Sequence, residues 1–326
     1  VVGILLIFTV TVTTNDVDGF EDFIEGSNQF SFDLYQALKK PFENLIVSPI
    51  TADIVIALAY TGAGGNTQTE IAKALHLPVE LEYVLKLYKH LLKALQDPGL
   101  CLVIKLFIEK TLTVELEFQD RALNYFQSDA GLVSFVANPA SVKKEINQWF
   151  EQKTNNTITD LLGEDSVDSS TRMILTNAAY FKAIWESQFD PRLTNDDDFH
   201  VTPQNTVKVK MMFQRNGFPF RSHSELKAKI LQLLYKNKDF SMIIILPDNI
   251  IDLPGVENRL SRSNFTEILQ SLIYTNLNVK LPKFTMNKTM KVTETLKQLG
   301  IKDLFNQSAA NLTGIAENLY ATAVCQ

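Results

Sequence analysis

The segment Met173–Phe181 constrains the fold most, because it is a long apolar run without a charged side chain. Such a run predicts a strand buried on both faces, and each face then needs a cover. Between Ser141 and Thr154, apolar residues recur at three- and four-residue steps, which predicts an amphipathic helix. These residues are Val142, Ile146, Trp149 and Phe150. The two segments together predict a helix lying across a central sheet.

Further helices are expected in the first half of the chain. Ser48-Pro49 is a strong helix start, because a serine hydroxyl can cap a backbone N–H and proline at the first helical position loses no hydrogen bond. The apolar run that follows ends at Gly62. Thr67 and Glu70 have the spacing of a capping box, which predicts a second short helix beginning at Thr67.

The second half of the chain is predicted to be mainly strands. Residues 230–235 and 240–247 flank a polar turn and predict a hairpin. Residues 278–284 alternate apolar with polar up to a proline, which predicts a half-buried strand near a sheet edge. A last short helix should close at Gly300. No linker-like stretch separates the two halves, so the sequence predicts one α+β domain.

Composition excludes several classes of protein. The chain has 326 residues, is 45% hydrophobic and carries a net charge of −6, with no basic cluster dense enough to follow a phosphate backbone. Nucleic acid is therefore not an expected partner. One basic stripe falls at helical spacing and is interpreted as a solvated helix face, with binding of a sulfated polysaccharide as the alternative. It consists of Lys86, Lys89, His90 and Lys93.

No enzyme chemistry, cofactor or metal site is predicted. The histidines lie far apart with no ligand at metal-binding spacing, and no nucleophile-elbow, phosphate-loop or dinucleotide motif occurs. Cys101 and Cys325 are interpreted as free thiols, with a single disulfide as the alternative. The histidines are His76, His90, His200 and His223.

The N-terminus suggests secretion. Residues 1–14 begin with an apolar run that is too short to span a bilayer and is interpreted as the remnant of a secretory signal peptide. A buried first strand is the alternative. Five Asn-x-Ser/Thr sequons are candidate glycosylation sites and are compatible with an extracellular glycoprotein. They lie at Asn155, Asn264, Asn287, Asn306 and Asn311.

Several segments, in this order, resemble the serpin family. Residues 44–51 are similar to its Asn-x-x-x-Ser-Pro-x-Ser motif, with Thr51 in place of the second serine. Residues 177–185 are similar to its Asn-x-x-x-Phe-Lys-Gly-x-Trp strand, with Ala183 in place of glycine. The resemblance extends over one domain from about residue 20 to residue 326. Further matches are Phe189, Thr194, Phe199, 209–212, 240–247, 279–284, 299–301 and 312–315.

The resemblance implies a fold and a mechanism. Serpins are α+β proteins with a large mixed central sheet, a second sheet and surrounding helices. They offer a reactive loop to a serine or cysteine protease, and the cleaved loop then inserts as a new strand into the central sheet. The resemblance therefore implies a protease inhibitor and no enzyme, with serine proteases and cysteine proteases as partner classes.

The resemblance also implies which residues control insertion. Ser48, Thr51, Asn177 and Gln326 match the polar cluster under the middle of the sheet, the shutter, whose hydrogen bonds hold two strands together until the loop arrives. Gln326 stands at a position that is often histidine in the family. Trp185 and Thr194 match the breach, the region at the top of the sheet where insertion begins. The alternative is that these residues serve ordinary packing and capping.

The resemblance stops at Gln326, before the reactive loop and the two strands that follow it in the family. We therefore expect this chain to be a truncated form of a secreted inhibitor, and we expect it to be inactive without the loop. A non-inhibitory serpin acting as carrier, storage protein or chaperone is one alternative. A loopless protein that binds partners by strand addition is another.

Overall fold

The computed structural model describes residues 5–10, 17–40, 43–164, 166–260, 263–286 and 288–326, with side chains from residue 17 onward. The chain forms two compact units, one from residues 1–12 and 183–286 and the other from residues 13–182 and 287–326. The chain passes between these units three times, so neither unit is a single continuous segment. Each is described by itself.

The larger unit is built on a mixed sheet with the strand order β10-β4-β2-β3. Strand β4 is antiparallel to β2, whereas the pairs β10–β4 and β2–β3 are parallel. The first six residues of β4 are buried, which confirms the prediction of a central strand at 173–181. The strands are β2 (Leu100–Glu109), β3 (Ala130–Val133), β4 (Met173–Phe181) and β10 (Ala323–Cys325).

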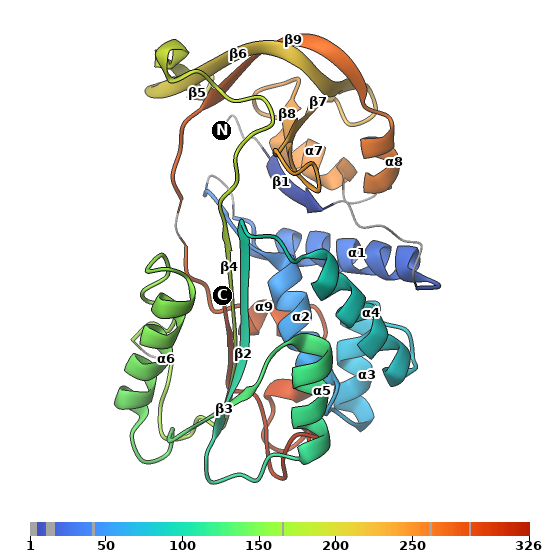
Figure 1. The fold of residues 1–326 in the computed structure, drawn as a ribbon, viewed down its shortest axis with the longest axis vertical. Helices are drawn as coiled ribbons and strands as arrows, with labels where there is room; N and C mark the ends of the chain where they lie inside the picture. Colours follow the sequence, from blue (N-terminus) through green and yellow to red (C-terminus); the bar gives the residue numbers. More distant parts are fainter. Residues whose placement is uncertain (1–4, 11–16, 41–42, 165, 261–262, 287) are drawn as a thin grey trace. The chain divides into compact units, whose positions relative to one another are not determined.

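One face of this sheet is covered by α6 (Pro139–Lys153), as predicted (Figure 1). Its buried side chains Val142, Ile146 and Phe150 form an apolar cluster with residues from all four strands. A lysine of β2 lies beneath the same helix: the Lys105 ammonium is 2.8 Å from Asp129 and 4.8 Å from the ring centre of Trp149. Both apolar packing and a cation therefore attach α6 to the sheet.

The other face is covered by α2 (Pro49–Tyr60), around which the remaining helices of this unit pack (Figure 1). Every residue of α2 from Thr51 to Tyr60 is buried, because the helix lies between the sheet and a further layer of helices. The helices near it are α1 (Phe20–Leu38), α3 (Gly65–Ala74), α4 (Leu81–Ala94), α5 (Leu116–Phe126) and α9 (Thr293–Gln298), with the 3₁₀ turn η2 (Asp303–Phe305).

The predicted start of α2 at Ser48-Pro49 is confirmed, but the predicted capping by the Ser48 hydroxyl is wrong, and the start of α3 is wrong in detail. The Ser48 hydroxyl makes no capping hydrogen bond, whereas its carbonyl oxygen accepts from the nearby Thr51 hydroxyl and from the distant Gln326 amide. Helix α3 begins at Gly65 rather than Thr67, so the predicted capping box lies inside the helix. The Thr67 hydroxyl instead accepts the backbone N–H of Asn311, and Glu70 accepts the N–H groups of Lys302 and Asp303. Tertiary partners have replaced the local ones.

The smaller unit contains a sheet with the order β1-β8-β7-β6-β5, in which β9 also pairs with β6. The predicted hairpin is confirmed as β7 and β8, and β9 pairs with β6 alone among the described strands, as expected near an edge. The strands are β1 (Leu5–Val10), β5 (Asn195–Thr202), β6 (Asn205–His223), β7 (Ala228–Leu234), β8 (Phe240–Pro247) and β9 (Ile273–Pro282). Helices α7 (Leu253–Leu260) and α8 (Phe265–Gln270) and the 3₁₀ turn η1 (Pro191–Leu193) complete the unit.

The N-terminal segment adopts the arrangement that the sequence left as the alternative to a signal remnant. Residues Leu5–Val10 form β1, which runs antiparallel to β8. Removal of residues 1–14 from the natural protein stays a prediction. Within the described part of the chain, we find no helix with the length and apolar character needed to cross a bilayer.

The two cysteines are free thiols, as interpreted from the sequence. Cys101 pairs with Tyr180 and Cys325 with Thr176, so they lie on opposite sides of β4 and four positions apart along it. Four strand positions correspond to about 13 Å. That separation exceeds the roughly 7 Å between Cα atoms that a disulfide tolerates.

We predict that Phe150→Ala lowers the free energy of unfolding of the larger unit by about 3–5 kcal/mol, because a fully buried ring is lost between α6 and the sheet. Urea denaturation followed by circular dichroism measures this change. Gln148→Ala on the exposed side of the same helix is the control and should change stability by less than about 0.5 kcal/mol. Equal effects of the two substitutions would contradict the packing described.

Candidate functional site

The candidate site lies where β10 runs beside β4. The two strands are paired only through Ala323, Val324 and Cys325, which stand opposite Ile174, Leu175 and Thr176. One position further, the same register brings Gln326 next to Asn177. Thr51, in the first turn of α2, reaches this point from the face of the sheet that α2 covers. We keep the name shutter cluster for Ser48, Thr51, Asn177 and Gln326.

A chain of hydrogen bonds joins the four residues of the shutter cluster. The Thr51 hydroxyl lies 2.7 Å from Asn177 Oδ1 and 2.9 Å from the Ser48 carbonyl oxygen, so its single proton can be donated to one of these acceptors at a time. Gln326 Nε2 donates to the Ser48 carbonyl oxygen and lies 3.1 Å from Thr51 Oγ1. The cluster thus links α2, β4 and the end of β10.

The cluster has more hydrogen-bonding groups than it has bonds. Thr51 and Asn177 are fully buried, yet Asn177 Nδ2 and Gln326 Oε1 have no hydrogen-bond partner among the residues that the structure describes. A buried amide group without a partner costs about 1–3 kcal/mol. A rearrangement at the junction of β4 and β10 that gave hydrogen-bond partners to both Asn177 Nδ2 and Gln326 Oε1 would therefore be stabilising.

Strand β10 is also held on its other side. The backbones of Gln326 and Met290 exchange two hydrogen bonds of 2.9 and 2.7 Å, and the Val292 N–H donates to the Val324 carbonyl oxygen. The Val324 N–H donates to the Thr293 hydroxyl over 3.0 Å. Residues 290–293 therefore hold β10 along the edge that faces away from β4.

The structure thus brings together Thr51, Asn177 and Gln326, as expected from the family resemblance. Ser48 takes part through its backbone and not through its hydroxyl, so the expected polar side chain at this position is replaced by a carbonyl oxygen. The cluster is electrically neutral. The thiol of neighbouring Cys325 is also neutral at ordinary pH, because burial raises its pKa to about 11. The role of the cluster in insertion stays a prediction.

Trp185, expected at the breach, packs within the smaller unit. Its ring stacks on Tyr235 with the ring centres 4.3 Å apart and the planes 12° from parallel. The Glu186 N–H donates to the Leu234 carbonyl oxygen, and the Lys236 N–H donates to the Ile184 carbonyl oxygen, so residues 184–186 pair antiparallel with residues 234–236 at the end of β7. Burial raises the pKa of the Tyr235 phenol well above its usual range.

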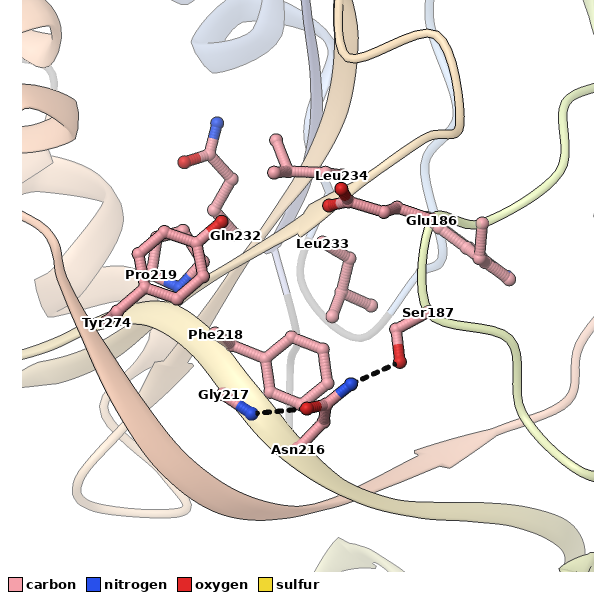
Figure 2. Close-up of a pocket in the computed structure, with 11 residues that line it drawn as sticks. Glu186, Ser187, Asn216, Gly217, Phe218, Pro219, Gln232, Leu233, Leu234 and Tyr274 are labelled. Carbon is pink, nitrogen blue, oxygen red and sulfur yellow. Dashed lines mark hydrogen bonds between the residues drawn. The ribbon is translucent and has the colours of Figure 1, made fainter.

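Trp185 borders a pocket of about 320 Å³ in the smaller unit (Figure 2). In this pocket, Asn216 Nδ2 donates to the Ser187 hydroxyl and Asn216 Oδ1 accepts the N–H of Gly217. Phe218, Pro219, Leu233, Leu234 and Tyr274 supply most of the apolar wall. Thr194 follows η1, where its N–H donates to the Pro191 carbonyl oxygen, and it does not line this pocket.

The sequons differ in accessibility. Asn155, Asn264 and Asn306 are exposed, and Asn155 lies at a helix end with a positive φ of 54°. Asn264 also caps α8, because its Oδ1 accepts the N–H of Glu267. Asn311 is half-buried and its Oδ1 accepts the Thr313 hydroxyl. Asn287 lies outside the described residues. Occupancy of these sequons stays a prediction.

The basic stripe predicted on one helix is exposed along α4. Lys86, Lys89 and Lys93 are exposed, and Lys89 lies 5.3 Å from the ring centre of Tyr125. His90 is half-buried and packs its ring edge-on against Phe20.

Within the described residues, no group of three His, Cys, Asp or Glu side chains is arranged to hold a metal ion.

Sequence reasoning missed the buried charged groups of the larger unit, two of which are Asp53 and Lys105. Asp53 is buried in α2, and Lys105 is buried between β2 and α6. Each is a lone charge inside an otherwise apolar segment, and this pattern was a usable signal. A buried charge needs hydrogen bonds or an opposite charge, so both positions point to specific tertiary partners.

Comparison with known proteins gives consistent matches. Residues 25–326 match the protein family described as Serpin (serine protease inhibitor). The leukocyte elastase inhibitor of Equus caballus is 31% identical over 318 residues, which cover 93% of this chain and 84% of the relative. Iris of Ixodes ricinus is 35% identical over 309 residues, which cover 90% and 80%. A solved structure described as cleaved Serpin 42Da has a TM-score of 0.86 at 32% identity, over 91% of this chain and 80% of that chain.

We predict that Thr51→Val destabilises the larger unit by about 1–3 kcal/mol, because the shape is kept while Asn177 Oδ1 and Gln326 Nε2 lose their shared hydroxyl partner. Thr51→Ser keeps the hydroxyl and should cost about 1 kcal/mol for one buried methyl group. Thermal and urea unfolding measure both changes. A valine variant as stable as the wild type would show that the hydroxyl network contributes nothing.

Proposed function

Because this chain belongs to the serpin family of serine protease inhibitors, we propose that its protein traps serine proteases by inserting a cleaved reactive loop between β4 and β10. The family inhibits proteases and is not a family of enzymes. In the family's order of segments the reactive loop follows the strand that here ends at Gln326. We therefore make this proposal for a chain in which such a loop follows Gln326.

The observation that carries the proposal is the short parallel contact between β4 and β10. Only three residue pairs join the strands, whereas β4 pairs with β2 over nine positions. Separating β10 from β4 breaks few backbone hydrogen bonds. A strand placed between them would be paired along both of its edges, so the number of backbone hydrogen bonds would rise.

The unsatisfied atoms of the shutter cluster support the same site. Asn177 Nδ2 is a donor without a partner and Gln326 Oε1 is an acceptor without one. An extended strand presents N–H and C=O groups along both edges. An incoming strand can therefore supply the missing partners while it replaces the bonds that Thr51 and Gln326 give up.

We further propose that the natural protein is secreted and glycosylated. The apolar run at the start of residues 1–14 supports a signal segment by its composition, whereas the pairing of Leu5–Val10 with β8 favours the alternative of a first strand. The exposed sequons at Asn155, Asn264 and Asn306 are accessible to glycosylation. The target is a serine protease, with a cysteine protease as the alternative.

We propose a sulfated polysaccharide as a further candidate partner, the alternative being that the basic stripe of α4 is an ordinary solvated helix face. Lys86, Lys89 and Lys93 are exposed on one side of α4 at intervals of three and four residues. Such spacing aligns the ammonium groups in a row along the helix, and a row of cations complements a linear polyanion.

We predict that a short synthetic peptide built from Thr, Ala and Gly binds this chain as a strand and raises its thermal midpoint. With free peptide at a hundred times its Kd, the expected stabilisation is about 2.7 kcal/mol. Differential scanning calorimetry measures the shift, and hydrogen exchange locates the peptide by new protection of amides in Met173–Asn177 and Ala323–Gln326.

The control is the same peptide with proline at alternate positions, which removes the N–H groups that a ladder requires. Equal stabilisation by both peptides would rule out strand insertion. The natural protein with its loop should also form a complex with a serine protease that survives denaturing electrophoresis, whereas residues 1–326 alone should not. Failure of the natural protein to trap serine proteases of any primary specificity would overturn the inhibitory proposal.

A further inference from the structure

Asp53 is a carboxylate buried among the helices of the larger unit. It lies on α2 with 1% of its surface exposed. Its Oδ2 accepts the Ser27 hydroxyl of α1 over 2.6 Å, and its Oδ1 accepts a hydrogen bond from the Tyr88 hydroxyl of α4. One carboxyl group therefore joins three helices.

Aromatic rings surround the Tyr88 partner of Asp53. Tyr88 is packed edge-on against Phe23 of α1 and stacked on Phe126 of α5, with ring centres 5.1 and 5.4 Å away. The titratable groups that face Asp53 are Tyr88 and, through Tyr88, Tyr60 on the same helix. Among the described residues, no lysine, arginine or histidine forms an ion pair with Asp53.

Burial raises the pKa of the Asp53 carboxyl from 3.8 to about 6, and the hydrogen bonds from Ser27 and Tyr88 oppose this shift. Below pH 3.8 the carboxyl is neutral in closed and open states alike. Between pH 3.8 and about 6 only the open state releases the proton, so stability is lost as the pH rises through this window. Above about pH 6 the closed state also becomes ionised, and the loss levels off.

The same helix carries Thr51 of the shutter cluster. Thr51 and Asp53 are two residues apart, which corresponds to about 200° around a helix. Thr51 therefore faces the sheet, where it bonds Asn177, while Asp53 faces α1 and α4. The position of α2 depends on both sets of contacts, and no side chain of the shutter cluster itself titrates between pH 5 and 8.

We infer that Asp53 is a proton-dependent latch: its ionisation loosens α1 and α4 from α2 and thereby makes the shutter cluster easier to open. Acid conditions close the latch and neutral conditions release it. The latch itself stands on the burial of the Asp53 carboxyl without an ion-pair partner, which outweighs the two hydrogen bonds that favour its ionised form, and on its position between α1, α2 and α4. Only its consequence for protease trapping rests on the proposed function.

The size of the effect follows from one proton. With a closed-state pKa of about 6 and an open-state value of 3.8, the opening constant rises about tenfold between pH 5 and pH 7.5. Most of the rise falls below about pH 6.5, because Asp53 is already largely ionised in the closed state above that pH.

Hydrogen exchange of the whole chain between pH 5 and pH 7.5, corrected at each pH for the intrinsic exchange rate, tests the latch. In the wild type, the opening constants of amides in α1, α4 and Ala323–Gln326 should rise together by about tenfold. Asp53→Asn should make this profile flat. Ser27→Ala removes a hydrogen bond that favours the ionised carboxyl, so its profile should move to higher pH.

Asp120→Asn is the matched control, because Asp120 is an exposed aspartate of α5 and its loss should leave the profile unchanged. Equal pH dependence in the wild type and Asp53→Asn would overturn the inference. If Asp53→Asn does not fold, an unshifted Ser27→Ala profile would overturn it. A response confined to α1 and α4, with Ala323–Gln326 unchanged, would also overturn it. A full response in a chain that inserts no peptide would count against the proposed function and leave the latch standing.

Discussion

Strand β4 must be covered on both faces and paired on both edges, and the larger unit is arranged around this requirement. Its apolar side chains pack against α6 on one face and α2 on the other. Its pairing with β2 extends over nine positions, but its pairing with β10 extends over three. Strand β4 therefore has a strongly paired edge toward β2 and a weakly paired edge toward β10.

The buried part of β4 contains two polar residues, Thr176 and Asn177, and Asn177 belongs to the shutter cluster at the weakly paired edge. The Thr176 hydroxyl has a hydrogen-bond partner, because it donates to the Lys105 carbonyl oxygen over 2.7 Å. Asn177 keeps an unused donor. The difference between these neighbours shows that a polar residue in this strand can be fully satisfied, so the incomplete bonding of Asn177 is a local property of the shutter cluster.

Local sequence patterns predicted the elements well where their signal was local. The nine-residue uncharged run of β4, the spacing of Val142, Ile146 and Phe150, and the polar turn before Phe240 each gave the correct element. The capping role of the Ser48 hydroxyl and the start of α3 were predicted less well, because Ser48 and Thr67 bond partners that lie far away in the sequence. A capping motif cannot reveal such partners.

The candidate site was predictable only through the family resemblance. Thr51, Asn177 and Gln326 are distant in sequence, and no periodicity shows that they meet. The carbonyl role of Ser48 could not be predicted, because every residue has a backbone carbonyl and the choice depends on where α2 begins. Asp53 was overlooked although its charge stands alone in an apolar helix, since a sequence does not show whether Ser27 and Tyr88 lie close enough to bond it.

The contacts of α6 determine how the weakly paired edge can open. Ala323 and Cys325 of β10 belong to the apolar cluster under α6, together with residues of β2, β3 and β4. A strand inserted between β4 and β10 would move β10 away by about 4.8 Å, so α6 could not keep its contacts with both sides. Lys105, with Asp129 and Trp149, fixes α6 to β2. For the proposed insertion, opening would first have to break the packing of α6 on β10, and that packing would oppose insertion until a strand with two hydrogen-bonded edges compensated for it.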